Sequence, residues 1–219
     1  QEQLTKLGFK FGKNGAHSAR SLMIEELKHL LFSRDKSAQL KDYEDDVINF
    51  NLLHKPTEKS RRLTFRHLND LYGLDPAIPL FKVFRDWWEL HEDSQEILAL
   101  QLSLARDPLL RASAEIIIKL EPGEHLARET MEEFLAKDDP ERFSAASLKS
   151  FSQNINGTWT QAGFLSGKAK KYREIPKCSY VNVAYALFLA HCHGLSGMRL
   201  FDSFWCRTLV QDKETLFDL

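Results

Sequence analysis

The sequence predicts an all-α protein of two packed helical subdomains, and three observations lead to this fold class. Apolar residues recur at the three- and four-residue spacing of amphipathic helices along most of the chain. Proline, glycine and small polar residues separate these segments where helices start and stop. The strongest break, Glu121-Pro122-Gly123, predicts a boundary between an N-terminal helical domain of residues 1–120 and a C-terminal helical domain of residues 121–219.

The composition is that of an ordinary globular protein. The chain has 219 residues, of which 43% are hydrophobic and 28% are charged, so it can bury a core without metals or disulfides. Its formal net charge of -1 gives no overall attraction to nucleic acid, and any such binding must come from local patches. Three cysteines in a chain of this size favour a reducing compartment. With no signal-peptide pattern and no apolar run that reaches the roughly 20 residues of a membrane span, we expect a cytoplasmic protein that makes no membrane contact.

In the N-terminal domain, caps mark the first three helices. Ser18 is expected to cap the first, and residues 40–50 carry the apolar spacing of the second. Thr57 is expected to cap the third, which ends at Gly73 because a left-handed residue is easily adopted there.

Prolines and one triple-isoleucine run define the next three helices. The fourth begins near Pro79, and Ser94 is expected to cap the fifth. Asp107-Pro108 separates the fifth from the sixth, residues 109–120, because the residue before proline disfavours helical backbone. The run Ile116-Ile117-Ile118 is consistent with a buried strand or a buried helix, and its alanine-rich flanks favour the helix.

The C-terminal domain is predicted to begin with two helices joined by a break. The first covers residues 126–137, and Asp138-Asp139-Pro140 ends it. Ser144 is expected to cap a longer helix that stops at Gly163. Two more helices are expected at residues 180–193 and 198–209, before a short tail with a last turn.

The helix after Ser144 and the segment that follows it have the order of a winged helix-turn-helix unit. Lys149, Gln153 and Asn156 are expected to share its outer face, and such residue types reach phosphates and base edges from a helix in a major groove. A basic segment follows, with Lys168, Lys170, Lys171 and Arg173. Whether this segment is a folded β-wing or an irregular loop stays open. The alternative for the whole unit is a core helix with a solvated face and a lysine-bearing loop.

A second basic cluster lies near the start of the third helix, with Lys55, Lys59, Arg61, Arg62 and Arg66. Lys59, Arg62 and Arg66 lie at positions i, i+3 and i+7 and therefore share one helical face. Side chains on such a face can contact successive phosphates. The alternative is a solvated face, or pairing with acidic neighbours such as Asp70.

No motif predicts a catalytic or cofactor site. The sequence holds no G-x-S-x-G, H-E-x-x-H or Rossmann glycine pattern. The stretch GFKFGKNGAHS does not fit a phosphate loop, and we expect a flexible arm there that tracks phosphates through its lysines. The cysteines are too widely spaced for a zinc site with His191 and His193. We therefore expect no metal, no cofactor and no enzymatic activity.

Five segments, in this order along the chain, resemble one protein family. They are LGFKFGKNGAHSARSLMIEELKHLL, NFNLLHKPTEKSRRLTFRHLNDLYGLDP, LALQLSLARDPLLRASAEII, MEEFLAKDDPERFSAASLKSFSQNINGTWTQAGFLSGKAKK and VAYALFLAHCHGLSGMRLFDSFWCRTL. Together they resemble the BrxA family of the bacterial BREX (bacteriophage exclusion) anti-phage defence systems. The resemblance implies a small, all-helical, cytoplasmic and non-enzymatic accessory factor that binds DNA beside other defence-system proteins. It identifies no individual functional residues.

Two functions are therefore expected to compete. The first is binding of double-stranded DNA, mainly through backbone phosphates at the two basic clusters. The second is a protein–protein adaptor of the defence complex with weak or no DNA binding, for which the chain offers a surplus of aromatic residues. These are Phe81, Phe84, Trp87, Trp88, Phe201, Phe204 and Trp205, and the plainer interpretation is that all of them belong to the core.

Overall fold

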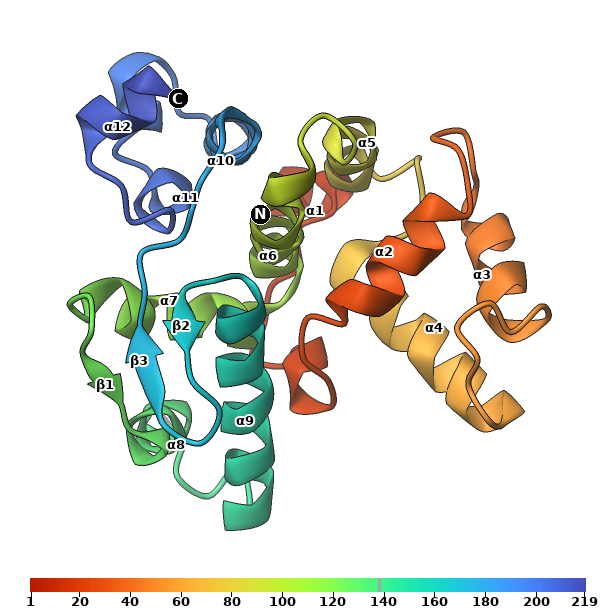
Figure 1. Ribbon diagram of the computed structural model, residues 1–219, viewed down its shortest axis with the longest axis horizontal. Coiled ribbons are helices and arrows are strands. Elements are labelled where there is room, and N and C mark those ends of the chain that lie inside the picture. Colours follow the sequence, from red (N-terminus) through yellow and green to blue (C-terminus); the bar gives the residue numbers. More distant parts are fainter. Residues whose placement is uncertain (138) are drawn as a thin grey trace.

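The computed structural model describes residues 1–137 and 139–219, and it confirms the all-α class (Figure 1). The first half of the chain forms α1 (Glu2–Leu7), the 3-10 helix η1 (Ala16–Ser18), α2 (Ile24–Phe32), α3 (Leu40–Ile48), α4 (Glu58–Tyr72), α5 (Pro79–Trp87), the 3-10 helix η2 (Glu92–Ser94) and α6 (Gln95–Arg106). The second half forms α7 (Pro108–Lys119), β1 (His125–Leu126), α8 (Arg128–Ala136), α9 (Ala145–Gln161), β2 (Leu165–Ser166), β3 (Lys171–Arg173), α10 (Tyr180–Cys192), η3 (Gly197–Leu200), α11 (Phe204–Arg207) and α12 (Lys213–Asp218).

Helix ends lie where they were predicted at the cap Thr57, at Gly73 and at the two prolines that begin α5 and α7. Thr57 accepts a hydrogen bond from the Ser60 amide at the start of α4, and Gly73 ends the helix with a φ of 63°. Pro79 and Pro108 are the first residues of α5 and α7. The triple-isoleucine run lies within α7, so the helical interpretation is confirmed.

Four predicted segments differ in the structure. The helix expected after Ser18 begins only at Ile24, because Met23 has left-handed backbone with a φ of 53°. The helix expected to reach Phe50 ends at Ile48. The helix expected over residues 198–209 is divided into η3 and α11. The N-terminal arm forms α1, and the segment after it is packed, with Phe9 buried and Lys10 paired to Asp70.

The basic segment folds as a β-hairpin. Within the described residues, three short strands form one antiparallel sheet in the order β1-β3-β2, and β2 and β3 make a hairpin. His125 and Leu126, placed by the sequence in a loop and a helix start, form the edge strand β1, so α8 begins two residues later, at Arg128. Asp138, part of the predicted break after α8, lies outside the described residues.

The helix before the predicted boundary packs with the segment after it. α8, α9 and the β2–β3 hairpin follow one another in the predicted order of helix, turn, helix and wing, with α9 beside the hairpin (Figure 1), and together they form the helix–hairpin unit. The indole Nε1 of Trp159 in α9 donates to Ser113 Oγ in α7 at 2.8 Å. This contact fixes the inner face of α9 and leaves its opposite face to solvent.

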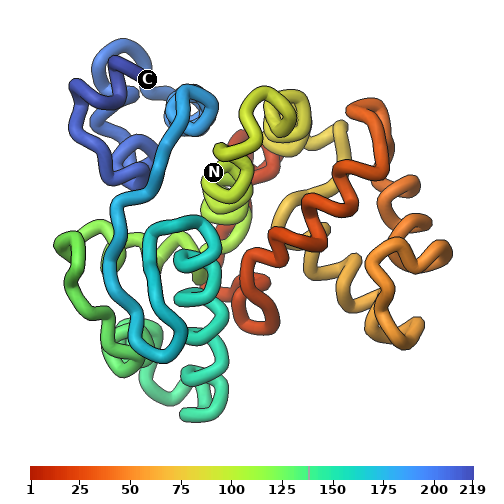
Figure 2. The backbone as a smooth tube through the Cα atoms, viewed as in Figure 1, coloured from red at the N-terminus to blue at the C-terminus, as the bar shows by residue number. Residues whose placement is uncertain are grey.

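The C-terminal helices return to the first half of the chain. α10 packs against α6, where Gln101 Nε2 donates to the Asn182 carbonyl at 2.8 Å. The chain therefore runs from α6 through the helix–hairpin unit and back to α6, as the tube in Figure 2 follows. Among the described residues, no helix combines the length and the apolar character that crossing a membrane requires.

Candidate nucleic-acid interface

The outer face of α9 begins from a well-formed helix start. Ser144 accepts a hydrogen bond from the Ser147 amide at 3.2 Å, which satisfies one of the unpaired donors of the first turn. Ile155 and Trp159 are buried on the inner side. Lys149 and Gln153 are exposed on the other side, as predicted.

Asn156 departs from the prediction. It was expected on the outer face with Lys149 and Gln153, but its side chain is only 5% exposed. The helical spacing placed it correctly along the axis, but its side chain belongs with the buried residues of α9, such as Ser152 and Ile155. The expectation that Asn156 contacts the surface of a duplex from an exposed position is therefore wrong.

The hairpin carries its lysines around a tight turn. Gly167 has a φ of +86°, and a Cβ atom there would lie 2.1 Å from the Lys170 carbonyl oxygen, so the turn requires glycine. Lys168 and Lys170 are exposed at the tip. Lys171 is half-buried, its Nζ donates to the Gly167 carbonyl at 2.6 Å, and burial lowers its pKa. Two lysines of the predicted basic segment are thus available to a ligand, and the third faces inward.

Arg173 is a core residue, and its prediction as a nucleic-acid contact is wrong. Its side chain is 1% exposed. The guanidinium donates to the carbonyls of Ile117 and Phe164, each at 3.0 Å, and lies over the Phe164 ring. Alternation along β3 explains this, because residues 171 and 173 point inward while Tyr172 between them points outward.

A hollow of about 430 Å³ lies between α9 and the hairpin. Gln153, Asn156 and Gly157 line it from α9, and Lys168 and Lys171 line it from the hairpin. Arg128, at the start of α8, also lines it, but its guanidinium pairs with Glu129 at 3.1 Å and Glu132 at 2.9 Å. We call this space the helix–hairpin hollow.

The second basic cluster is partly neutralised. Lys55 Nζ pairs with Glu26 at 3.0 Å, and Arg61 donates to the Ile48 carbonyl at 2.6 Å. Arg62 pairs with Glu58 at 2.6 Å, and its hydrogen bond and charge lower the pKa of Glu58. Among the described residues, no carboxylate pairs with Lys59 or Arg66, and both are exposed on α4. Lys59 and Arg66 are therefore the exposed members whose charge no carboxylate offsets among the described residues, whereas Arg61 keeps its charge but is half-buried.

The two clusters lie apart in the fold. α4 begins at the lower right of Figure 1, and the turn between β2 and β3 lies at the lower left, with α9 between them. This separation could not be predicted from the positions of the two clusters along the chain. The structure brings Lys149, Gln153 and the hairpin lysines together around α9, and it leaves Lys59 and Arg66 on a different element.

A buried hydrogen-bond chain joins three distant segments beneath α9. His17 Nδ1 and the Asp107 carboxylate are 2.8 Å apart, and His17 Nε2 lies 2.7 Å from Thr158 Oγ1. This order of hydroxyl, imidazole and carboxylate is that of a catalytic triad, but all three side chains are fully buried and a substrate has no access. Sequence reasoning missed the chain because its members are far apart and carry no common motif.

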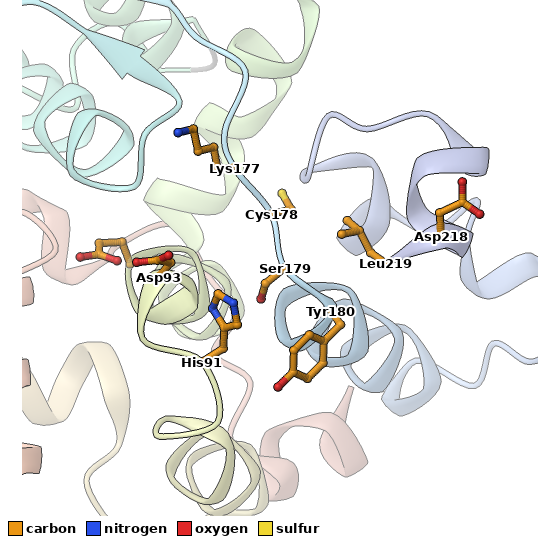
Figure 3. Close-up of a pocket in the computed structure, with 9 residues that line it drawn as sticks. His91, Asp93, Lys177, Cys178, Ser179, Tyr180, Asp218 and Leu219 are labelled. Atoms are coloured by element: carbon orange, nitrogen blue, oxygen red, sulfur yellow. The ribbon is translucent and has the colours of Figure 1, made fainter.

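Another hollow, of about 620 Å³, lies where η2 meets the start of α10 (Figure 3). His91 faces Ser179 and Tyr180 there. The Cys178 thiol points to the Leu209 carbonyl 3.6 Å away, and burial raises its pKa to about 12. Such a thiol is un-ionised at neutral pH and is a poor nucleophile. Within the part of the chain that the structure describes, no cluster of His, Cys, Asp and Glu has the grouping of a metal site.

No protein-family model and no curated protein sequence matches the chain. The function of the helix–hairpin unit is therefore argued from its own residues.

Proposed function

We propose that the protein binds double-stranded DNA without catalysis, through α9 and the β2–β3 hairpin. The observation that carries the proposal is the joint exposure of Lys149 and Gln153 on α9 with Lys168 and Lys170 on the adjacent hairpin. Within the described residues, no carboxylate pairs with these three lysines. Unneutralised lysines on a helix and a neighbouring loop match the phosphate backbone on either side of a groove.

The residue types favour backbone contact over sequence reading. A helix fits the major groove, and Gln153 is the one exposed amide on α9 that lies in line with Lys149. The remaining contacts come from lysines, which bind phosphates as point charges and read no bases. Lys59 and Arg66 on α4 supply a second phosphate contact where a duplex extends that far.

A place in an anti-phage defence system is part of the same proposal. It is supported by the resemblance of the sequence to the BrxA family, and the geometry of α9 and the hairpin is compatible with an accessory factor that holds DNA for other components.

A salt titration of DNA binding tests the proposal. Fluorescence polarisation of a labelled duplex gives the affinity of the wild type and of the triple variant Lys149→Glu, Lys168→Glu, Lys170→Glu. The wild-type affinity is expected to fall steeply with salt. The variant is expected to bind at least tenfold more weakly. Its slope of log affinity against log salt concentration is expected to be smaller by about one unit per lost phosphate contact.

A matched control separates local contact from net charge. Lys6→Glu, Lys41→Glu, Lys82→Glu changes the net charge equally, on exposed lysines of α1, α3 and α5 that already pair with carboxylates. It is expected to retain most of the wild-type affinity at moderate salt. No wild-type binding at low salt, or equal losses in both triple variants, would contradict the proposed interface.

An adaptor function is the second candidate, and two exposed phenylalanines favour it. The aromatic residues predicted to be surplus are buried or packed on the core instead. Phe32 and Phe50, however, are 93% and 74% exposed at the ends of α2 and α3, and exposed aromatics serve as anchors in interfaces. Co-purification of the neighbouring gene products that survives nuclease but is lost in Phe32→Ser, Phe50→Ser supports the adaptor.

A further inference from the structure

The helix–hairpin hollow contains a buried amide oxygen without a partner. Asn156 is 5% exposed and its side chain lines the hollow beside Gln153. Among the described residues, no donor reaches its buried Oδ1 atom. A buried acceptor left unpaired destabilises the free protein, and a ligand that donates a hydrogen bond to it removes that penalty.

The rest of the hollow has the chemistry of a nucleotide site. Its volume of about 430 Å³ falls within the roughly 300–1,000 Å³ of small-molecule pockets. Asparagine and glutamine amides present a donor beside an acceptor, which matches the edge of a base. Lys168 supplies positive charge on the opposite wall for a phosphate, whereas Lys171 Nζ is held by the Gly167 carbonyl and the charge of Arg128 is offset by its two glutamates.

Gly157 adds an independent observation. It lies in the middle of α9, where glycine weakens a helix relative to alanine. Packing does not demand it, because a Cβ atom there would meet only Ser21 Cβ, at an ordinary 3.7 Å. A glycine that lines the hollow leaves the helix backbone open to close approach by a flat group.

We propose that this hollow binds one unpaired nucleotide. Asn156 Oδ1 accepts from a donor on the edge of the base, its Nδ2 donates to the acceptor beside that donor, and Lys168 holds the phosphate. A base inside an intact duplex is stacked and paired, so it does not reach a side chain this deeply buried. The proposal rests on the proposed DNA binding, and its nucleotide belongs either to a DNA strand or to a free mononucleotide.

Three duplexes of equal length test the strand-borne form. One is fully paired, one has a central unpaired deoxyadenosine, and one has a central abasic site. The wild type is expected to bind the unpaired-adenine duplex roughly tenfold more tightly than the abasic duplex, because the abasic duplex lacks one good amide–base pair. Asn156→Leu is expected to lose this preference and to keep its affinity for the paired duplex.

A stability measurement on Asn156→Leu, one further variant and a control complete the test. Asn156→Leu is expected to unfold at or above the wild-type temperature, because it removes a polar group that has an unpaired oxygen. Gln153→Leu, at an exposed position, is expected to weaken the preference without touching the core. Ser150→Ala, exposed on α9 but outside the hollow, is the control and is expected to behave as the wild type.

The outcomes separate this inference from the proposed function. Equal wild-type affinity for all three duplexes overturns the strand-borne site and leaves duplex binding intact. If the wild type binds no duplex, the proposed function fails. A calorimetric titration with dAMP and dTMP then decides whether the hollow binds a free nucleotide. Binding of dAMP that Asn156→Leu abolishes identifies a free nucleotide as the occupant, and no dAMP binding overturns the inference.

Discussion

Asp107 joins η1 to the start of α7 through one carboxylate. Its Oδ1 accepts from the amides of Leu109 and Leu110 at the start of α7, and its Oδ2 accepts from the His17 amide at 2.9 Å and faces the His17 ring. In Asp107→Asn the amide oxygen can still cap α7, but the amide nitrogen cannot accept from His17. We expect this variant to lose roughly 2–4 kcal/mol of unfolding free energy, since a buried donor is left unpaired. Urea unfolding at pH 7 measures the loss.

The same residue predicts a pH dependence. Burial acts to raise the pKa of Asp107, and the hydrogen bonds and charge of His17 with the backbone amides outweigh it, so the pKa is lowered. A lowered folded-state pKa stabilises the protein above the unfolded value of about 3.9 and ceases to do so as the pH falls through the folded value. The advantage of the wild type over Asp107→Asn should therefore be full at pH 7 and shrink below about pH 4. A constant difference between pH 7 and pH 3 would show that the Asp107 charge has no such role.

Single residues also show where sequence reasoning ends. Lys168 and Arg173 lie in one basic segment and have the same local signal, yet one is at the tip of the hairpin and the other is in the core. Alternation along a strand separates them, and the strand was not predictable from a segment this short and polar. Asn156 was assigned to the correct helix, but the helical spacing did not reveal that its side chain is buried.

At the scale of elements, the hairpin depends on Gly167. Alanine there must adopt a φ of +86° with its Cβ 2.1 Å from the Lys170 carbonyl oxygen. The left-handed backbone alone costs about 1–2 kcal/mol, and the overlap forces the turn to open. We expect Gly167→Ala to speed amide hydrogen exchange in residues 165–173 and to weaken DNA binding, because Lys168 and Lys170 lose their fixed positions.

Gly163→Ala is the matched control for the hairpin. Gly163 has a φ of +80°, and its Cβ would meet no atom within 4 Å. This variant is expected to have the backbone strain without the overlap, so the hairpin keeps its register and its exchange protection. Equal exchange in the two variants would mean that the turn does not depend on Gly167.

Elements with local signals were predictable, and elements that depend on distant contacts were not. Thr57, Gly73 and Pro79 set helix ends through their own backbone and side-chain chemistry, and the structure has the ends there. β1 consists of two residues that become a strand only because β3 lies beside them. Met23 has left-handed backbone, which no preference of methionine indicates.

At the scale of the whole molecule, buried hydrogen bonds tie the last helices to the first half of the chain. Asn182 in α10 donates to the Ser94 carbonyl at 3.0 Å and accepts from Gln101 through its own carbonyl at 2.8 Å. Tyr185 donates to the Leu80 carbonyl at 3.0 Å. α7 meanwhile holds α9 through Ser113 and Trp159. These contacts cross the sequence-predicted boundary after residue 120 in two places, and that boundary itself stays a prediction.

Because of these contacts, we expect the chain to unfold as one cooperative unit. Far-UV circular dichroism and tryptophan fluorescence should give the same urea midpoint, and the most protected amides of α6, α9 and α10 should exchange with similar free energies. Asn182→Ala should lower the unfolding free energy measured by both probes equally, by roughly 1–3 kcal/mol, since it leaves the buried Ser94 carbonyl without its partner. Leu187→Ala, a partly buried position on the same helix that makes no such bond, separates the loss of the hydrogen bond from a general weakening of α10. Two separate transitions, one for residues 1–120 and one for residues 121–219, would instead make the break at Glu121-Pro122-Gly123 a true folding boundary.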